Sequence, residues 1–242
     1  MSLIWTKKRG GVHAALLSKA EETTGARIST LANLETRSEE VQALEANRTL
    51  LAEHLEWPSL RLSMARQVHG THVAFTDKPE IIDNTDALVT NRVNLAIGVL
   101  VADCAAVLIA DPVYRIVAAV HAGWRGAAGN IVEKGVATMI RAGAEPDVMQ
   151  AYISPCISVA NFEVGEEVAE KFPQRFVDYT GVKPHVDLKG FLRQELMDTG
   201  IPDDRIQVDG RCTLQEAETL HSYRRDGNDS GRMLAVIALG DS

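Results

Sequence analysis

The chain lacks a basic tract, and its excess of charge is acidic. Among 242 residues, 33 Asp and Glu outnumber 25 Lys and Arg, which gives a formal net charge of −8. Nucleic acids and anionic membrane surfaces attract clustered Lys and Arg, so this balance argues against either as the main partner. The composition therefore favours a small-molecule ligand, with no nucleic acid and no membrane.

Cysteine is scarce, and long apolar runs are absent. Cys104, Cys156 and Cys212 lie far apart, and their odd number does not suit a disulfide framework. The longest apolar stretch, residues 95–110, is short for a membrane span and contains Asp103. The first residues lack the apolar core of a signal peptide. These features predict a cytoplasmic protein in a reducing compartment.

Internal repeats, low-complexity segments and Pro/Ser-rich linkers are also lacking, so we expect one α/β domain over residues 1–242. Apolar periodicity predicts helices over residues 37–56, 131–141, 164–172 and 189–199. Short β-branched runs predict strands over residues 60–68, 73–76, 87–90, 95–101, 106–110, 116–120, 151–153 and 233–239. The middle strands cluster rather than alternate with helices, so a regular doubly wound sheet is not expected.

The segment His-Ala-Gly-Trp-Arg-Gly, residues 121–126, is the most informative part of the chain. It follows an apolar run, so a histidine stands where a buried strand is predicted to end in a glycine-rich turn. Glycines allow the backbone to approach a ligand closely, and the N-terminus of a following helix offers N–H groups to an anion. Asn130 is expected to cap that helix. Arg125 is suited to binding a phosphate or carboxylate.

Two further segments place a possible metal ligand beside a turn: His69 in Gln-Val-His-Gly and Cys104 in Ala-Asp-Cys. With His121 they match a catalytic zinc site, which uses three protein ligands and leaves one position open. The long spacing leaves open whether they are ligands or ordinary core and capping residues. Asp103 needs a partner because burying an unpaired carboxylate is costly. His72 is read as a surface residue.

Nine short motifs, and the order in which they follow one another along the chain, resemble those of the YfiH-type family. This family was once named multicopper polyphenol oxidases and is now described as purine nucleoside phosphorylases with adenosine deaminase activity. The motifs are residues 67–70, 86–88, 102–104, 111–112, 121–126, 162–165, 212–213, 222–225 and 231–232. The resemblance extends over nearly the whole chain. It implies mixed β-sheets packed as a central sandwich with helices outside. It also implies a zinc site formed by His69, Cys104 and His121.

The resemblance implies phosphorolysis of adenosine, inosine or methylthioadenosine, and deamination of adenosine. Cys104, Asp103 and Arg125 are the expected catalytic residues, with Asp103 carrying a proton or orienting a ligand. The expected substrate contacts are Arg125, Arg224, Arg225 and Gln67, with the arginines holding the phosphate anion. The protein is expected to act as a monomer or homodimer.

Four positions depart from the family pattern. Lys8 replaces an arginine and His13 a serine near the N-terminus. Ala106 stands where a proline follows Ala-Asp-Cys-x, and Ser154 replaces the glycine of a Gly-Pro pair. The three metal ligands are unchanged. Lysine does not reproduce a bidentate arginine, so the departures bear on substrate contacts rather than on the metal.

Three alternatives stay open at this point. Two histidines and a cysteine also suit a blue-copper site, as in a polyphenol oxidase. A laccase additionally needs a trinuclear cluster held by many histidines, and most of the seven present lie outside the motifs. Cys104 is also a candidate nucleophile of a metal-free cysteine hydrolase that edits cell-wall precursors. The last alternative is a non-catalytic, metal-stabilised binding protein.

Overall fold

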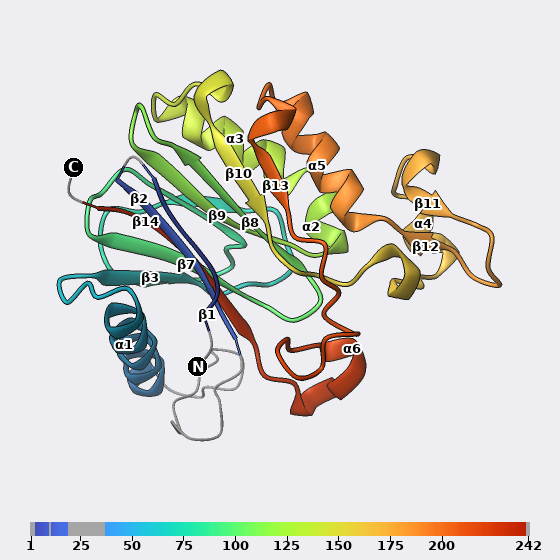
Figure 1. Ribbon diagram of the computed structural model, residues 1–242, viewed down its shortest axis with the longest axis horizontal. Helices are drawn as coiled ribbons and strands as arrows, with labels where there is room; N and C mark the ends of the chain where they lie inside the picture. The colour runs from blue at the N-terminus through green and yellow to red at the C-terminus, as the bar shows by residue number, and fades with distance from the viewer. Residues whose placement is uncertain (1–2, 10, 19–36, 241–242) are drawn as a thin grey trace.

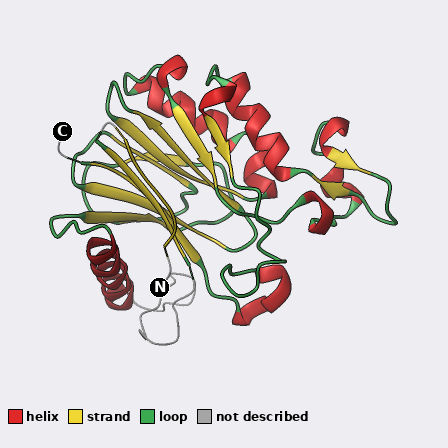
Figure 2. Ribbon diagram, in the orientation of Figure 1, coloured by secondary structure: helices red, strands yellow, loops and turns green. Residues whose placement is uncertain are grey.

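Two six-stranded mixed sheets pack face to face, with helices on their outer faces (Figures 1 and 2). The computed structural model describes residues 3–9, 11–18 and 37–240. The first sheet has the order β1 (Leu3–Arg9), β2 (Val12–Leu17), β14 (Met233–Leu239), β7 (Leu95–Val101), β3 (Arg61–Ala65) and β5 (Ile81–Ile82). The second has the order β13 (Ile206–Val208), β10 (Gln150–Ile153), β8 (Ala105–Asp111), β9 (Ile116–Ala122), β6 (Ala87–Thr90) and β4 (Val73–Phe75).

The helices cover both outer faces and lie at the ends of the sheets. They are α1 (Arg37–His54), α2 (Trp124–Ala128), α3 (Ile131–Arg141), α4 (Glu166–Ala169), α5 (Leu188–Asp198) and α6 (Tyr223–Asp226). Helix α1 packs on the first sheet, whereas α2, α3 and α5 pack on the second. A small hairpin of β11 (Val177–Asp178) and β12 (His185–Val186) lies beside α4 at one end of the molecule (Figure 1).

The core has three layers, one between the sheets and one beneath each group of helices. Leu108, Val117 and Ile237 fill the space between the sheets. Val120 packs in the layer beneath α3 and α5, and Leu62 in the layer beneath α1. The central strands are thus buried on both faces, which explains why they read in sequence as continuous apolar runs.

The expected sandwich is confirmed, and several elements match closely. Strands β6, β7 and β14 and helix α3 have the expected bounds. The expected helix over residues 164–172 is shorter, since only α4 forms there. None of the helices in the described ranges combines the length and the apolar character needed to cross a bilayer.

The prediction of a glycine-rich turn after His121 is wrong. Strand β9 continues through His121, and helix α2 begins at Trp124, so residues 124–126 are helical. Asn130 does precede α3, but with φ 61° and no capping bond from its side chain. Glu195 of α5 takes over that function: its Oε1 accepts the N–H of Glu133 in the first turn, at 2.9 Å. An acceptor from a neighbouring helix thus replaces the expected local cap.

Two of the departures from the family pattern form a pair in the core. The N–H of Ala106 donates to Oγ of Ser154 at 2.9 Å, and both residues are completely buried. A proline at 106 has no N–H to satisfy, and a glycine at 154 has no hydroxyl to offer. His13 lies on β2 with its ring against Trp57. The Lys8 side chain lies outside the described residues.

The buried carboxyl of Glu195 should make the free energy of unfolding depend on pH. Burial raises the pKa of this carboxyl to about 7, against the opposing N–H donors of Glu133 and Val132. The folded state therefore holds the proton more tightly than the unfolded state, and the free energy of unfolding falls as the pH rises from about 4.5 to about 7. We expect Glu195→Gln to be more stable than the wild type at pH 8 by about 3 kcal/mol, and similar to it at pH 4.5. Urea unfolding at both pH values measures this difference.

Glu170→Gln is the control, because Glu170 is exposed. It should leave the pH dependence unchanged. A Glu195→Gln variant whose stability tracks the wild type at both pH values would contradict the assignment.

Candidate metal centre

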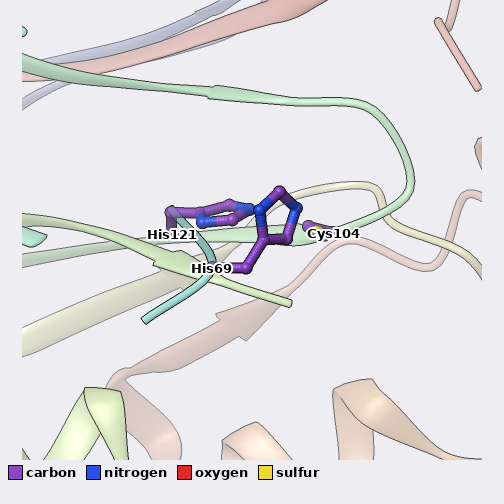
Figure 3. Close-up of side chains that lie close together, drawn as sticks. All are labelled: His69, Cys104 and His121. Atoms are coloured by element: carbon purple, nitrogen blue, oxygen red, sulfur yellow. The ribbon is translucent and has the colours of Figure 1, made fainter. Parts of the chain in front are cut away.

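Three side chains from separate segments converge at one end of the two sheets (Figure 3). His69 lies in the loop between β3 and β4, Cys104 in the turn between β7 and β8, and His121 near the end of β9. Their possible ligand atoms all lie within 4.8 Å of one another. The two imidazole rings stand edge to face, with centroids 4.8 Å apart. The structure thus brings together the three residues that the sequence proposes as metal ligands.

Asp86, immediately before β6, holds the ring of His121 and the backbone that carries His69. It is fully buried, and its Oδ1 lies 2.8 Å from Nδ1 of His121 and accepts the N–H of His69 at 2.9 Å. Its Oδ2 accepts the N–H groups of Val68 and Gly70. Such a carboxylate holds Nδ1 of His121 protonated and leaves Nε2 as the ligand atom. His69 adopts φ 58°, a conformation that these bonds maintain.

Gly123 leaves room for the thiol. A Cβ at this position would lie only 2.7 Å from Sγ of Cys104 and 3.5 Å from the ring of His69. Since real Cβ atoms do not approach so closely, the glycine is required by the approach of β9 and α2 to the cysteine. The glycine in the sequence motif thus serves the ligand cluster.

The charges of the cluster favour a metal ion. Burial by itself raises the pKa of the Cys104 thiol, but the imidazoles of His121 and His69 lower it to about 6. The resulting thiolate is the form that binds metals. Burial raises the pKa of Asp86 as well, but the His121 ring and the N–H groups of Gly70 and Val68 hold it below its usual range. The donor set, its ionisation and the orienting carboxylate all fit a zinc ion.

The cluster opens into a cavity of about 660 Å³, which is in the usual range for small-molecule sites. Besides the cluster, the cavity is lined by Ala65, Arg66, Gln67, Leu100, Ala102, Asp103, Trp124, Arg125, Tyr223, Arg224, Asn228 and Arg232. Four of these residues are arginines, in a chain of net charge −8. The cavity therefore favours an anionic ligand group next to the cluster.

The expected substrate residues have different surroundings. Arg125 lies in the cavity with its guanidinium over the ring of Trp124 at 4.3 Å, and Arg224 also lines the cavity. Gln67 lines it too, but its amide pairs with the backbone of Leu100 through two 2.8 Å bonds. Arg225 does not line this cavity, because its guanidinium pairs with Asp226 and donates to three carbonyls of residues 213–220.

Asp103 lies beside the cluster, but its carboxylate faces the C-terminal region. Oδ1 accepts the hydroxyl of Thr213 and Oδ2 accepts the N–H of Arg224, each at 2.6 Å. His72 is exposed, as expected, and its Nδ1 lies 3.0 Å from Oγ1 of Thr85. Cys156 and Cys212 are buried and face each other across a short bridge between parallel segments.

Sequence reasoning missed Asp86 as a functional residue and did not place Arg66, Tyr223 and Arg232 in the cavity. Asp86 carries a signal that points to its role, because a carboxylate at the start of an apolar strand needs buried partners. The arginines carry no comparable local signal, since their position depends on how distant loops meet.

The Asp86→Asn variant tests whether Asp86 holds His69 and His121 in position for a metal. An amide cannot accept four hydrogen bonds as the carboxylate does, so we expect zinc affinity to fall about 10- to 100-fold while the fold persists. Competition with a chelator measures the affinity, and circular dichroism checks the fold. Asp83→Asn, at an exposed partner of Arg66, is the matched control. Wild-type zinc affinity in a folded Asp86→Asn protein would contradict the proposed role.

Comparisons with known proteins identify the family and the fold. A family model described as multi-copper polyphenol oxidoreductase laccase matches residues 6–240. A purine nucleoside phosphorylase of Deinococcus radiodurans is 36% identical over 211 residues, covering 86% of this chain and 81% of that protein. A protein named adenosine deaminase RL5, from an unknown prokaryotic organism, is 35% identical over 194 residues, covering 73% of this chain and 74% of that protein.

A solved structure has the same fold. The YfiH protein of Bacillus licheniformis superposes with a TM-score of 0.81 at 27% identity, covering 94% of this chain and 92% of that one. Family model, relatives and fold agree over most of the sequence. The chain therefore belongs to the YfiH-type family, which the motifs around His69, Cys104 and His121 indicated.

Proposed function

We propose that the chain is a zinc-dependent enzyme of purine nucleosides, acting as one catalytic domain. It carries out phosphorolysis of adenosine, inosine or methylthioadenosine and deamination of adenosine. The observation that supports this most is the His69–Cys104–His121 cluster at the base of an arginine-lined cavity. The names of the relatives, purine nucleoside phosphorylase and adenosine deaminase, supply the substrate class.

The ligand set supports zinc rather than the copper named in the family description. A laccase holds several copper ions, three of them bound mainly by histidines, whereas the described side chains form one group of at least three His, Cys or carboxylate residues within ligand distance. A zinc ion held by three protein ligands supplies Lewis-acid chemistry, which polarises a substrate heteroatom or lowers the pKa of water.

The residues of the chain bind and orient the reactants. In phosphorolysis, phosphate attacks C1′ of the ribose and the purine leaves, so an anion must be held beside a neutral sugar. Arg125 and Arg224 carry the charge for this, because arginine donates paired hydrogen bonds to phosphate. Trp124 and Tyr223 line the cavity as well, and the ring faces that Arg125 and Arg232 do not cover suit the purine. In deamination, water replaces the amino group at C6 and ammonia leaves.

Turnover and metal content test this proposal together. We expect zinc-loaded protein to convert adenosine to inosine, and to adenine when phosphate is present, with chromatography to separate the products. His69→Ala should lose both zinc and turnover, because two ligands hold zinc too weakly. His72→Ala, an exposed histidine three residues away, should lose neither. Absence of turnover in fully zinc-loaded protein would refute the proposal.

The same protein samples test whether Cys104 is a zinc ligand or a nucleophile. Its lowered pKa also suits a nucleophile, as in a cysteine hydrolase. If Cys104 is a zinc ligand, saturating zinc should protect it from iodoacetamide, as mass spectrometry of the labelled peptide will show. Labelling that continues in saturating zinc would favour the hydrolase.

The cavity arginines should act mainly on phosphate. We expect Arg125→Ala and Arg224→Ala to raise the KM for phosphate about 10- to 100-fold, since each removes charged hydrogen bonds of about 1.5–3 kcal/mol. Deamination, which uses no phosphate, should change less. Arg175→Ala is the control, because Arg175 lies outside the cavity on the ring of Phe176. Equal losses in both reactions would contradict the assignment to phosphate.

A further inference from the structure

Asp103 holds an unusual conformation for a residue with a side chain. It occupies the turn between β7 and β8 with φ 82°, and its carbonyl accepts the N–H of Ile157 at 3.0 Å. This region of backbone space is costly for residues other than glycine, although Asp tolerates it better than most. A glycine at this position would avoid the strain, so the turn itself does not require Asp.

The carboxylate of Asp103 joins two segments more than 100 residues away. Thr213 donates its hydroxyl to Oδ1, and the backbone N–H of Arg224 donates to Oδ2, each at 2.6 Å. The N–H of Arg224 belongs to the first turn of α6, where the Oγ of Ser222 accepts only the N–H of Arg225. Asp103 thus supplies the acceptor that the start of this short helix lacks.

Helix α6 in turn carries part of the cavity wall. Tyr223 and Arg224 line the cavity that contains the ligand cluster. The guanidinium of Arg224 is held at its far end by two 3.2 Å bonds to the carbonyl of Glu163. Both residues are exposed, so packing does little to hold them against the cavity. The later part of α6 is anchored by Arg225, whose guanidinium donates to three carbonyls of residues 213–220. Asp103 holds the first turn, which carries Tyr223 and Arg224.

We propose that Asp103 is a positioning residue that ties the turn carrying Cys104 to α6, and thereby sets the distance of Tyr223 and Arg224 from the metal cluster. Both oxygens of the carboxylate are engaged by donors from the C-terminal region. It therefore serves as a fixed acceptor and not as a proton carrier, one of the two roles that the sequence suggested. This inference rests on the proposed function for its kinetic consequence. The tie itself is independent of the substrate.

The test compares Asp103→Gly with Asp103→Asn. Glycine suits φ 82° and removes both acceptors, so the turn persists while α6 loosens. Asparagine also tolerates this conformation, and its amide can present oxygen to the Arg224 N–H and nitrogen to the Thr213 hydroxyl. Asn cannot carry a proton as a carboxyl does. A positioning role therefore predicts rescue by Asn, and a proton-carrying role predicts none.

In zinc-loaded protein, we expect trypsin to cleave after Arg224 and Arg225 about tenfold faster in Asp103→Gly than in the wild type, since cleavage follows local opening. The KM for nucleoside and the KM for phosphate should each rise about tenfold, because Tyr223 and Arg224 move together. The kcat should change less than about threefold, and zinc content should stay unchanged. Asp103→Asn should lie within about threefold of the wild type in each measurement. Glu56→Gly, an exposed acidic residue at φ 52°, is the control for glycine at a positive φ.

Three results would overturn the proposal. The first is equal tryptic cleavage in Asp103→Gly and wild type, and the second is an Asp103→Asn variant as inactive as Asp103→Gly. The third is a fall in kcat at constant KM, which would return Asp103 to a direct part in the chemistry. If the wild type turns over no purine nucleoside, the proposed function fails, and tryptic cleavage alone decides whether the tie exists.

Discussion

The candidate metal centre depends on one buried carboxylate. Asp86 bonds to the backbone of residues 68–70 and to the ring of His121, so it joins the loop of one ligand to the strand of another. Without Asp86, nothing in this set of bonds would hold the loop of His69, which has a positive φ, in a fixed position relative to the buried ring of His121. The charge of Asp86 is retained in the interior because four donors surround it, and this is the condition under which burying a carboxylate is tolerated.

The sequence predicts the continuous elements well and the short ones poorly. Strand β7 is a continuous apolar run and helix α3 has a strong periodic pattern, and both appear with the expected bounds. Helices α2 and α6 have only one turn each and leave no periodic signal. Some site residues could likewise be predicted from the local sequence, and others could not. His69, Cys104 and His121 stood out as ligand types beside turns, but whether Arg224 or Arg225 faces the cavity depends on side-chain partners in distant loops.

The cavity at the candidate site is lined by four arginines, although the chain as a whole is acidic. A chain with a net charge of −8 gathers Arg66, Arg125, Arg224 and Arg232 around one cavity. Low-dielectric walls focus such a field, so an anion entering the cavity meets a local potential opposite to that of the whole protein.

The hydrogen bond between Ala106 and Ser154 makes the identity of each residue conditional on the other. Replacing Ser154 by glycine alone would leave a buried amide without an acceptor, and such a change costs about 1–3 kcal/mol. The order of the two substitutions therefore matters, because proline at 106 removes the N–H before glycine at 154 removes its acceptor. Since β8 pairs with β10, the two strands constrain each other's sequence at this point.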